Sequence, residues 1–357
     1  MAHEELPPLN ITPGAIRFNT DSMKLEYYRG GPVGFGTLAT GEWVQLTTDS
    51  PDIQTGGTRG VFSGLGGYPS ISNVMNYVHV ETTGNALDFG NLTLPTRYGN
   101  AVGSRTRGIV FEGITSATNE DVDIQYFTFA STGSTIDFGG NSTAGRYGGL
   151  GLSNSTRGIR AGGYDTPDNT DVIDYITIAS TGVDAQDFGD LIQTFRYGNG
   201  AFANSTRGIV TGGYPGSGTD DSISFITIST QGNAADFGNL VVAKNSGSQG
   251  GSNAVRGIFV GGHNGSAVTN IIEYITIGTL GNAQDFGDLT TTTQYGAAAA
   301  SKTRLVIAMG NYPSYVNNID YLQIVTKGDS TDFGDLDVTG GDSGTGMGNS
   351  NGHGGLG

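Results

Sequence analysis

Short apolar runs recur along most of the chain at a nearly constant spacing. Within one repeat, residues 197–203 carry mostly small side chains, and residues 206–211 bring Ile and Val after a polar turn. Residues 223–228 are rich in β-branched and aromatic side chains, and a further extended stretch covers 236–240. Such runs, bounded by Gly, Asn and Ser, are typical of β-strands. We therefore expect four short antiparallel strands in each repeat.

Two tripeptides mark the repeat in six copies. Thr-Arg-Gly, or a variant of it, opens the second strand, and Asp-Phe-Gly lies in the fourth. Successive marker arginines are 48 to 50 residues apart, a constant spacing that indicates a repeat architecture. The marker arginines are Arg59, Arg107, Arg157, Arg207, Arg256 and Arg304, and the marker aspartates are Asp88, Asp137, Asp187, Asp236, Asp285 and Asp332.

Both faces of the third strand carry apolar residues. In one copy, Ile173 and Tyr175 point to one side while Ile176 and Ile178 point to the other. Such a strand is covered on both sides, as it would be in a blade between two neighbouring blades. The first strand has small side chains, which suit the crowded axis of a closed ring. The pattern predicts an all-β fold: a six-bladed β-propeller of four-stranded antiparallel blades with a period of about 49 residues, preceded by a small N-terminal β-hairpin module.

The propeller is expected to cover residues 57–357 and to close through its C-terminal segment. The first repeat lacks a small-residue strand ahead of Arg59, whereas residues 344–352 resemble residues 98–104, which hold that position in the next repeat. A strand supplied from the far end of the chain would complete the first blade and remove an open sheet edge. A linear stack of repeats is the alternative.

A glycine doublet ends the second strand in four repeats, and an aromatic strand follows it. The doublets, with the residue after each, are Gly66-Gly67-Tyr68, Gly162-Gly163-Tyr164, Gly212-Gly213-Tyr214 and Gly261-Gly262-His263. In units near fifty residues, this arrangement resembles the kelch-type β-propeller. The chain departs from that family at Glu112-Gly113 and Gly310-Asn311, and it lacks the usual tryptophan. The resemblance implies a divergent kelch-like propeller.

Residues 1–56 do not belong to the repeat. Residues 14–30 read as strand, Asn/Asp turn and strand, and residues 42–46 add a third strand. Their sequence resembles that of small β-modules of bacteriophage tail-fibre and other virion proteins. The motifs that carry the resemblance are Gly-x-Ile-Arg-Phe-Asn-Thr-Asp, Leu-Glu-Tyr-Tyr and Glu-Trp-Val. Three short strands rarely hold together alone, so we expect this module to attach to another chain, in a homo-oligomer or symmetric assembly. The residues expected at the attachment interface are Ile16, Phe18, Leu25, Tyr27 and Trp43.

Composition limits the classes of partner. Thirty-three acidic and seventeen basic residues give a net charge of −16, which disfavours nucleic acid because phosphate contacts need a basic surface. There is no cysteine, so no disulfide, thiolate metal site or cysteine nucleophile is expected. The N-terminus does not resemble a secretory leader, and no apolar run reaches about eighteen residues. We expect a protein made in the host cytoplasm, without a membrane span, that is assembled into a virion.

The marker tripeptides admit a structural and a chemical interpretation. Asp-Phe-Gly occurs in protein kinases, but six copies without the other kinase motifs favour a turn. In that turn the aspartate would bond backbone amides, the phenylalanine would fill the space between blades, and the glycine would take a positive φ. The repeated arginine needs a partner, and the marker aspartates suit bidentate ion pairs. We expect an Arg–Asp clamp; the alternative is a ring of arginines that binds an anion at one mouth of the channel.

Other candidate chemistry is weak. The four histidines, His3, His79, His263 and His353, show no metal-ligand spacing. Acidic loops after the glycine doublets could hold calcium through oxygen ligands, but they lack the EF-hand glycine and terminal glutamate. No Gly-x-Ser-x-Gly elbow with a paired His and Asp occurs, and no carboxylate pair stands out from the repeat. We expect no catalytic residue, no cofactor and no metal.

Three functions fit these observations to different degrees. The first is a non-enzymatic virion structural protein of a tailed bacteriophage, attached through residues 1–56 and displaying the propeller outward. The second is an adhesin that recognises a host receptor or a surface glycan through the propeller loops and exposed tyrosines. The third is a propeller enzyme such as a glycan hydrolase or lyase, which would need a charged constellation at the channel mouth.

Overall fold

The chain divides into two compact units, Met1–Ile53 and Gln54–Gly357. The computed structural model describes residues 15–19, 24–29, 42–45, 58–65, 71–115, 120–247, 250–308, 310, 316–337 and 347–356. The glycine doublet at 66–67 and the stretch 344–346, both used in the sequence argument, lie outside these ranges, as do the side chains of Phe18 and Leu25.

The first unit contains one three-stranded antiparallel sheet. Its strands are β1 (Ile16–Asn19), β2 (Lys24–Arg29) and β3 (Glu42–Gln45), in the order β1-β2-β3. Ile16 lies opposite Tyr27, and Tyr28 lies opposite Trp43. This agrees with the expected strand, turn and strand followed by a third strand.

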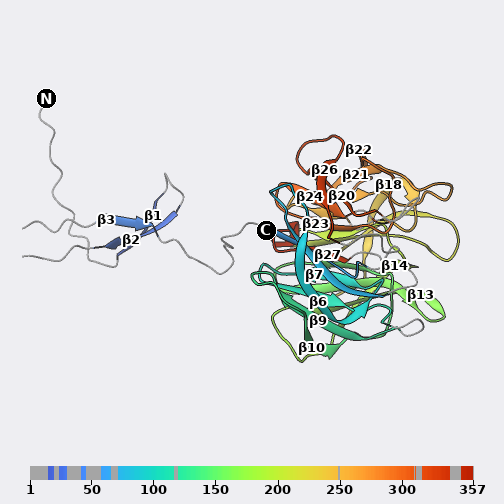
Figure 1. Cartoon of the computed structure of the whole chain (residues 1–357), viewed down its shortest axis with the longest axis horizontal. Coiled ribbons are helices and arrows are strands. Elements are labelled where there is room, and N and C mark those ends of the chain that lie inside the picture. Colours follow the sequence, from blue (N-terminus) through green and yellow to red (C-terminus); the bar gives the residue numbers. More distant parts are fainter. Residues whose placement is uncertain are drawn as a thin grey trace, which may run out of the picture. The chain divides into compact units, whose positions relative to one another are not determined.

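The second unit is a six-bladed β-propeller, as predicted (Figure 1). Each blade is one four-stranded antiparallel sheet. Blades 1 to 3 consist of β27 (Met347–Ser350), β4 (Arg59–Ser63), β5 (Ser72–His79) and β6 (Leu87–Thr96); β7 (Asn100–Gly103), β8 (Arg107–Phe111), β9 (Asp123–Thr128) and β10 (Ile136–Asn141); and β11 (Leu150–Ser153), β12 (Arg157–Asp165), β13 (Asp168–Thr177) and β14 (Gln186–Phe195).

Blades 4 to 6 repeat the same order of strands. They consist of β15 (Ala201–Ala203), β16 (Arg207–Thr211), β17 (Asp220–Thr227) and β18 (Ala235–Lys244); β19 (Gly251–Ser252), β20 (Arg256–Val260), β21 (Ile271–Thr276) and β22 (Gln284–Asp288); and β23 (Ala297–Ala300), β24 (Arg304–Ala308), β25 (Asn318–Gln323) and β26 (Thr331–Asp335). A 3₁₀ turn, η1 (Gly354–Leu356), follows β27. Within the described ranges, no helix has the length and hydrophobicity to cross a membrane.

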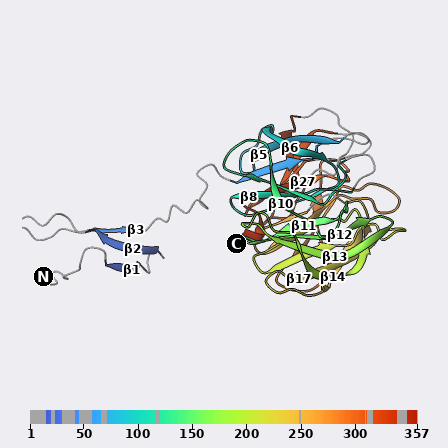
Figure 2. The ribbon, with the colours of Figure 1, turned by 90° about the horizontal axis from the view of Figure 1, so that it is seen from below.

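The C-terminal strand closes the propeller. Strand β27 pairs antiparallel with β4, with Met347 opposite Ser63 and Ser350 opposite Gly60. Figure 2 shows β27 beside the blue strands β5 and β6 of blade 1. The first blade therefore combines residues from both ends of the second unit. The predicted closure is confirmed, and the alternative of a linear stack is wrong.

Apolar side chains fill the space between neighbouring blades. Each marker phenylalanine is buried and meets the aromatic residue of the third strand in its own blade edge to face, as Phe188 meets Tyr175 at 5.8 Å between centroids. The same phenylalanine belongs to a cluster that includes Ile226 and Ile228 of the next blade. The predicted role of the marker phenylalanine, filling the space between blades, is confirmed.

The marker glycine makes a close approach to the next blade. Gly90 has a φ of 141°, and a Cβ placed on it would lie 2.4 Å from the carbonyl oxygen of Gly133. Beside it, the amide of Gly133 donates to the carbonyl of Phe89 at 2.7 Å. The equivalent bond between a turn glycine and the preceding marker phenylalanine recurs at all six blade boundaries. A side chain here would separate the blades, so the third position of the marker requires glycine.

Removal of residues 347–357 should destabilise the whole propeller. Blade 1 would lose its innermost strand and both of its neighbours would lose contacts, so we expect the melting temperature to fall by at least about 10 °C, or cooperative unfolding to disappear. Thermal unfolding followed by circular dichroism measures this. Removal of residues 1–53 is the control and should leave the propeller transition in place. An unchanged transition after the C-terminal deletion would contradict the closure.

Candidate functional site

The marker arginines bind the neighbouring blade, not the marker aspartates. Arg157 donates from Nη1 to the carbonyl of Ile228 at 2.6 Å, and its guanidinium lies 4.7 Å above the aromatic ring of Tyr175. Ile228 belongs to blade 4, whereas Tyr175 lies on the third strand of the same blade as Arg157. The arginine thus ties the end of one blade to the end of the next.

All six marker arginines repeat this pair of contacts. Their guanidinium groups lie 4.6 to 5.1 Å above Tyr77, Tyr126, Tyr175, Phe225, Tyr274 and Tyr321, in chain order. Their Nη1 atoms donate over 2.6 to 3.5 Å to the carbonyls of Phe129, Ile178, Ile228, Ile277, Ile324 and Val80. The last of these contacts joins Arg304 of blade 6 to blade 1. Because each guanidinium is engaged in this way, the repeat needs no bound anion to explain it.

The predicted Arg–Asp clamp is therefore wrong. The marker aspartates are exposed, and no ion pair within the described ranges joins one of them to a marker arginine. The arginine opens the second strand of a blade and the aspartate lies on the fourth, two strand spacings or about 10 Å away. The expected bond from the aspartate to a backbone amide occurs at Asp137, which accepts from Gly139 at 2.8 Å.

Substitution of a marker arginine should cost moderate stability. Arg157→Ala removes one charge-assisted hydrogen bond and one cation–π contact from a half-buried site, so we expect a loss of about 1–3 kcal/mol. Asp187→Ala, in the exposed marker aspartate of the same blade, should change the free energy of unfolding by no more than about 0.5 kcal/mol. Chemical denaturation measures both. Equal losses, with strong coupling in the double variant, would restore the Arg–Asp clamp.

A second polar repeat, missed from the sequence, lies inside the blade interfaces. The residue before the third-strand aromatic is polar and buried in every blade: Asn76, Gln125, Asp174, Ser224, Glu273 and Asp320. In five of the six, a side-chain oxygen accepts a backbone N–H from the outer strand of the preceding blade, or from the residues just after it. Ser224 is the exception. In its blade the contact is made by Ser222 and Asp220 of the same strand, whose side-chain oxygens accept from the side-chain amide of Gln193 in the preceding blade. The sequence did carry a signal for this pattern: in the third strand of every blade one polar residue stands between two apolar residues, and it recurs with the period of the blades.

Two of these buried carboxylates are neutralised by buried cations. Asp174 lies 2.6 Å from Arg146 and 3.1 Å from Arg160, and Glu273 lies 2.9 Å from Lys244. Burial alone would raise the pKa of Asp174, but the two arginines lower it to about 2. No cation among the described residues pairs with Glu112, which bonds Gln125, and burial raises its pKa to about 8. The arginines therefore favour the charged form of Asp174, whereas burial favours the neutral form of Glu112.

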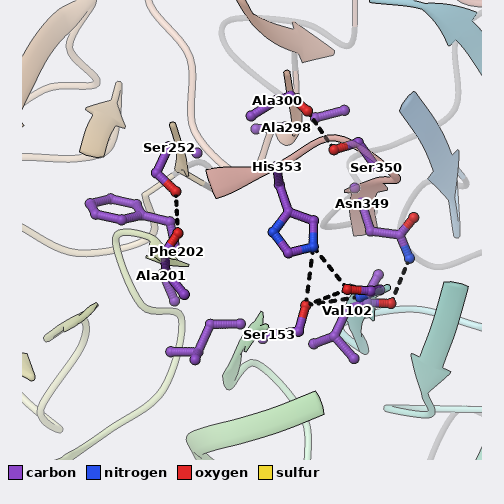
Figure 3. A pocket seen from close by; sticks show the side chains of 18 of the residues that line it. Val102, Ser153, Ala201, Phe202, Ser252, Ala298, Ala300, Asn349, Ser350 and His353 are labelled. Atoms are coloured by element: carbon purple, nitrogen blue, oxygen red, sulfur yellow. Dashed lines mark hydrogen bonds between the residues drawn. The ribbon is translucent and has the colours of Figure 1, made fainter. Parts of the chain in front are cut away.

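The central channel is narrow and lined by the innermost strand of every blade (Figure 3). Its cavity of about 50 Å³ is lined mainly by Ala, Gly and Ser, together with larger side chains such as Phe202, Asn349 and His353. It has room for a few water molecules and none for a substrate. Ser153, Ser252 and Ser350, from alternate blades, each donate a hydrogen bond to a carbonyl of the preceding blade. The channel is thus part of the core.

The C-terminal turn fills one mouth of this channel. His353 lines the cavity, accepts the amide of Gly355 at Nδ1 and donates from Nε2 to the carbonyl of Gly103 at 2.8 Å. Arg105 fixes the turn by donating to the carbonyl of Leu356 at 2.8 Å. Ser153 lies 3.3 Å from His353, but its hydroxyl donates to Gly103, so the pair is not arranged as a nucleophile and its base. His353 and Gly103 are 250 positions apart in the sequence, so their spacing could not have predicted that they meet.

Acid should weaken this C-terminal plug. Burial lowers the pKa of His353 from 6.5 to about 4, so the unfolded chain takes up a proton at a higher pH than the folded chain does. Stability contributed by the neutral imidazole is complete above pH 6.5 and decreases as the pH falls toward 4. A lowering of the pKa by this amount corresponds to a loss of roughly 1–3 kcal/mol near pH 4. Comparison of unfolding at pH 7 and pH 4.5 with the His353→Gln variant isolates this contribution, because glutamine does not titrate. Parallel pH dependence in the two proteins would contradict it.

The opposite mouth is closed by tyrosines from several blades. Tyr98, Tyr147, Tyr197 and Tyr295 precede four of the innermost strands, and their aromatic rings contact one another with centroids 5.3 to 6.4 Å apart. Tyr98, Tyr197 and Tyr295 adopt positive φ values of 53° to 61°. Burial raises the pKa of Tyr197 and Tyr295, so both phenols are neutral. At this mouth large aromatic side chains therefore fill the space around the axis, whereas inside the channel the innermost strands carry mostly small side chains.

A pocket of about 340 Å³ opens beside the tyrosine cluster. Its wall within the described ranges consists of Arg196, Tyr197, Tyr214, Asn245, Ser246, His263, Gln294 and Tyr295. The guanidinium of Arg196 lies 4.6 to 5.5 Å from the rings of Tyr164, Tyr197 and Tyr214. These residues come from the loops of successive blades, which the sequence could order along the chain but could not place around one cavity.

Ile16, Tyr27 and Trp43, the expected attachment residues whose side chains are described, lie on two faces of the first unit. Ile16 is exposed at 63% and lies opposite Tyr27, which is half-buried. Trp43 projects from the other face, where Arg17 stacks on it at 4.2 Å and Tyr28 meets it at 5.4 Å. Whether these residues form an interface stays a prediction.

The described residues contain no group of three or more His, Cys, Asp or Glu side chains arranged to hold a metal ion. Comparison of the sequence with protein-family models and with curated proteins gives no match. The fold therefore defines the class: a six-bladed β-propeller in a chain that also carries a small three-stranded unit.

Proposed function

We propose that this chain is a non-enzymatic structural protein of a tailed-bacteriophage particle that displays a divergent kelch-like propeller. The observation that carries the proposal is that the repeated charged residues serve the scaffold. Each marker arginine joins two blades, as Arg157 joins blade 3 to Ile228, and the buried acid Asp174 is held between two arginines. A propeller tied together in this way is a rigid body suited to display.

The first unit supplies the attachment in this proposal. Its sequence resembles β-modules of tail-fibre and other virion proteins, which is the support for a location in the particle. A single three-stranded sheet is too small to bury its own apolar side chains. Ile16 on one face and Trp43 on the other are available to another chain, because Ile16 is exposed and Trp43 is only half-buried. A symmetric assembly would cover both faces.

Receptor recognition is the second candidate function, and the pocket beside the tyrosine cluster favours it. The loops of the blades differ in sequence, whereas the strands repeat. At this end of the propeller three tyrosines surround Arg196. A glycoside hydrolase with the usual two catalytic carboxylates would need a pair of them in such a pocket, and the described wall has none. Binding without glycoside hydrolysis is therefore the better alternative.

Loss of the first unit should abolish attachment and leave the propeller folded. We expect a chain without residues 1–53 to keep the thermal transition of the propeller but to be absent from purified particles of the phage that produces it. An antibody against the propeller measures this in particle fractions. Ile16→Asp should weaken incorporation at least tenfold, and Leu280→Asp, at an equally exposed apolar residue of the propeller, should not. Normal incorporation of the truncated chain would place the attachment on the propeller.

A further inference from the structure

The pocket beside the tyrosine cluster has the size and construction of a small-molecule site. Its volume of about 340 Å³ falls at the lower end of the range for ligand pockets. The aromatic side chains of Tyr197, Tyr214 and Tyr295 alternate in its wall with the polar side chains of Asn245 and Gln294. A ligand that fits this wall must present both apolar and hydrogen-bonding surface. A sugar ring does so, since it has C–H faces that stack on aromatic rings and hydroxyls at its edge.

The positive charge of Arg196 favours sugars that carry a negative charge. Arg196 is held by aromatic rings on several sides, and its Nε is buried without a hydrogen-bond partner. No hydrogen bond within the described ranges engages its guanidinium, so the two Nη groups, which are not buried as Nε is, can donate to a carboxylate as a pair. Arg196 already occupies the space among these aromatic rings where a cationic ligand would bind, so a second cation would be repelled.

The overall charge of −16 does not decide the local preference. No carboxylate belongs to the described wall of the pocket, where Arg196 and His263 are the ionisable groups besides the tyrosines. At physiological ionic strength, charges beyond about 8 Å are largely screened. An acidic ligand therefore meets Arg196 and no carboxylate within the described wall.

Backbone strain is concentrated at this mouth of the channel, in the pocket wall and also at Tyr98, which is not part of the described wall. Tyr197, Ser246 and Tyr295 of the wall have positive φ values of 52° to 61°, a conformation that costs most residues free energy. Gly148 holds the equivalent position, with a φ of 68°, where the innermost strand of blade 3 begins. Glycine would thus satisfy the fold at this position. The side chains retained there instead face the pocket.

We infer that this pocket binds a saccharide that carries a carboxylate, with Arg196 bound to the carboxylate and tyrosine rings stacked on the sugar. The inference gives the second candidate function a site and a ligand class, and it does not depend on where the protein lies in a particle. Asn245, Gln294 and His263 would bond the hydroxyls. Ligands of this chemistry include hexuronate units and sialic acids.

Paired sugars that differ only in the carboxylate test this inference. Saturation-transfer NMR and titration with the full chain should show methyl β-glucuronide, methyl α-galacturonide or an N-acetylneuraminate glycoside binding at least tenfold more tightly than the matched neutral glycoside. Equal binding of the acidic and neutral members of a pair would remove the role of Arg196. Absence of binding by all three acidic sugars at tens of millimolar would overturn the inference.

Variants locate the binding and control for folding. Arg196→Ala should weaken acidic-sugar binding at least tenfold, and Gln294→Glu should do the same by adding a carboxylate to the wall without removing packing. Lys302→Ala removes one positive charge from an exposed turn at the other end of blade 6 and should change nothing. Unchanged binding in both pocket variants would exclude this pocket. Binding of the full chain to host cells despite failure with every sugar would leave receptor recognition intact and exclude only this ligand class.

Discussion

The hydrogen-bonded ladder between β27 and β4 is the contact on which the rest of the propeller depends. It joins residues more than 280 positions apart, since Met347 lies opposite Ser63. Closing a flexible loop of that length costs on the order of 5 kcal/mol, because the cost grows only with the logarithm of length. A four-residue strand alone would barely offset this. The closure holds because it also completes the interfaces of blade 1 with both of its neighbours.

Those interfaces combine apolar packing with a polar pattern that fixes the register of the blades. At the outer side, the amide of a turn glycine bonds the preceding marker phenylalanine, and at one end a marker arginine bonds the following blade. Inside, Asn, Gln, Asp or Glu performs the same task in five of six blades by accepting a backbone N–H. Each bond contributes little alone, on the order of 1 kcal/mol. Sixfold repetition makes the propeller rigid, because opening one interface strains the others.

The two ends of the channel differ in how far the repeats agree in sequence. One mouth is filled by η1 and His353, which are bonded to Arg105 and Gly103 of blade 2 and complete the closure. The other is surrounded by loops in which the repeats diverge: Arg196, Asn245 and Gln294 hold equivalent positions before three successive innermost strands. Regular contacts keep the shape of the propeller constant, and irregular residues at this mouth vary its chemistry. A display protein that recognises a ligand would be expected to use that end.

The sequence by itself determined the number and type of blades, because period, strand composition and turn residues are local properties that six copies reinforce. It also indicated the closing strand, since residues 344–352 repeat the pattern of an innermost strand. It misassigned the marker arginine, because complementary charge in a repeat says nothing about distance, and the nearest acceptor was a backbone carbonyl of another blade. Only the closed propeller brought Tyr98, Tyr147, Tyr197 and Tyr295 together. Residues about fifty positions apart become neighbours at the axis because each blade turns the chain by one sixth of a circle, and no local pattern encodes that convergence.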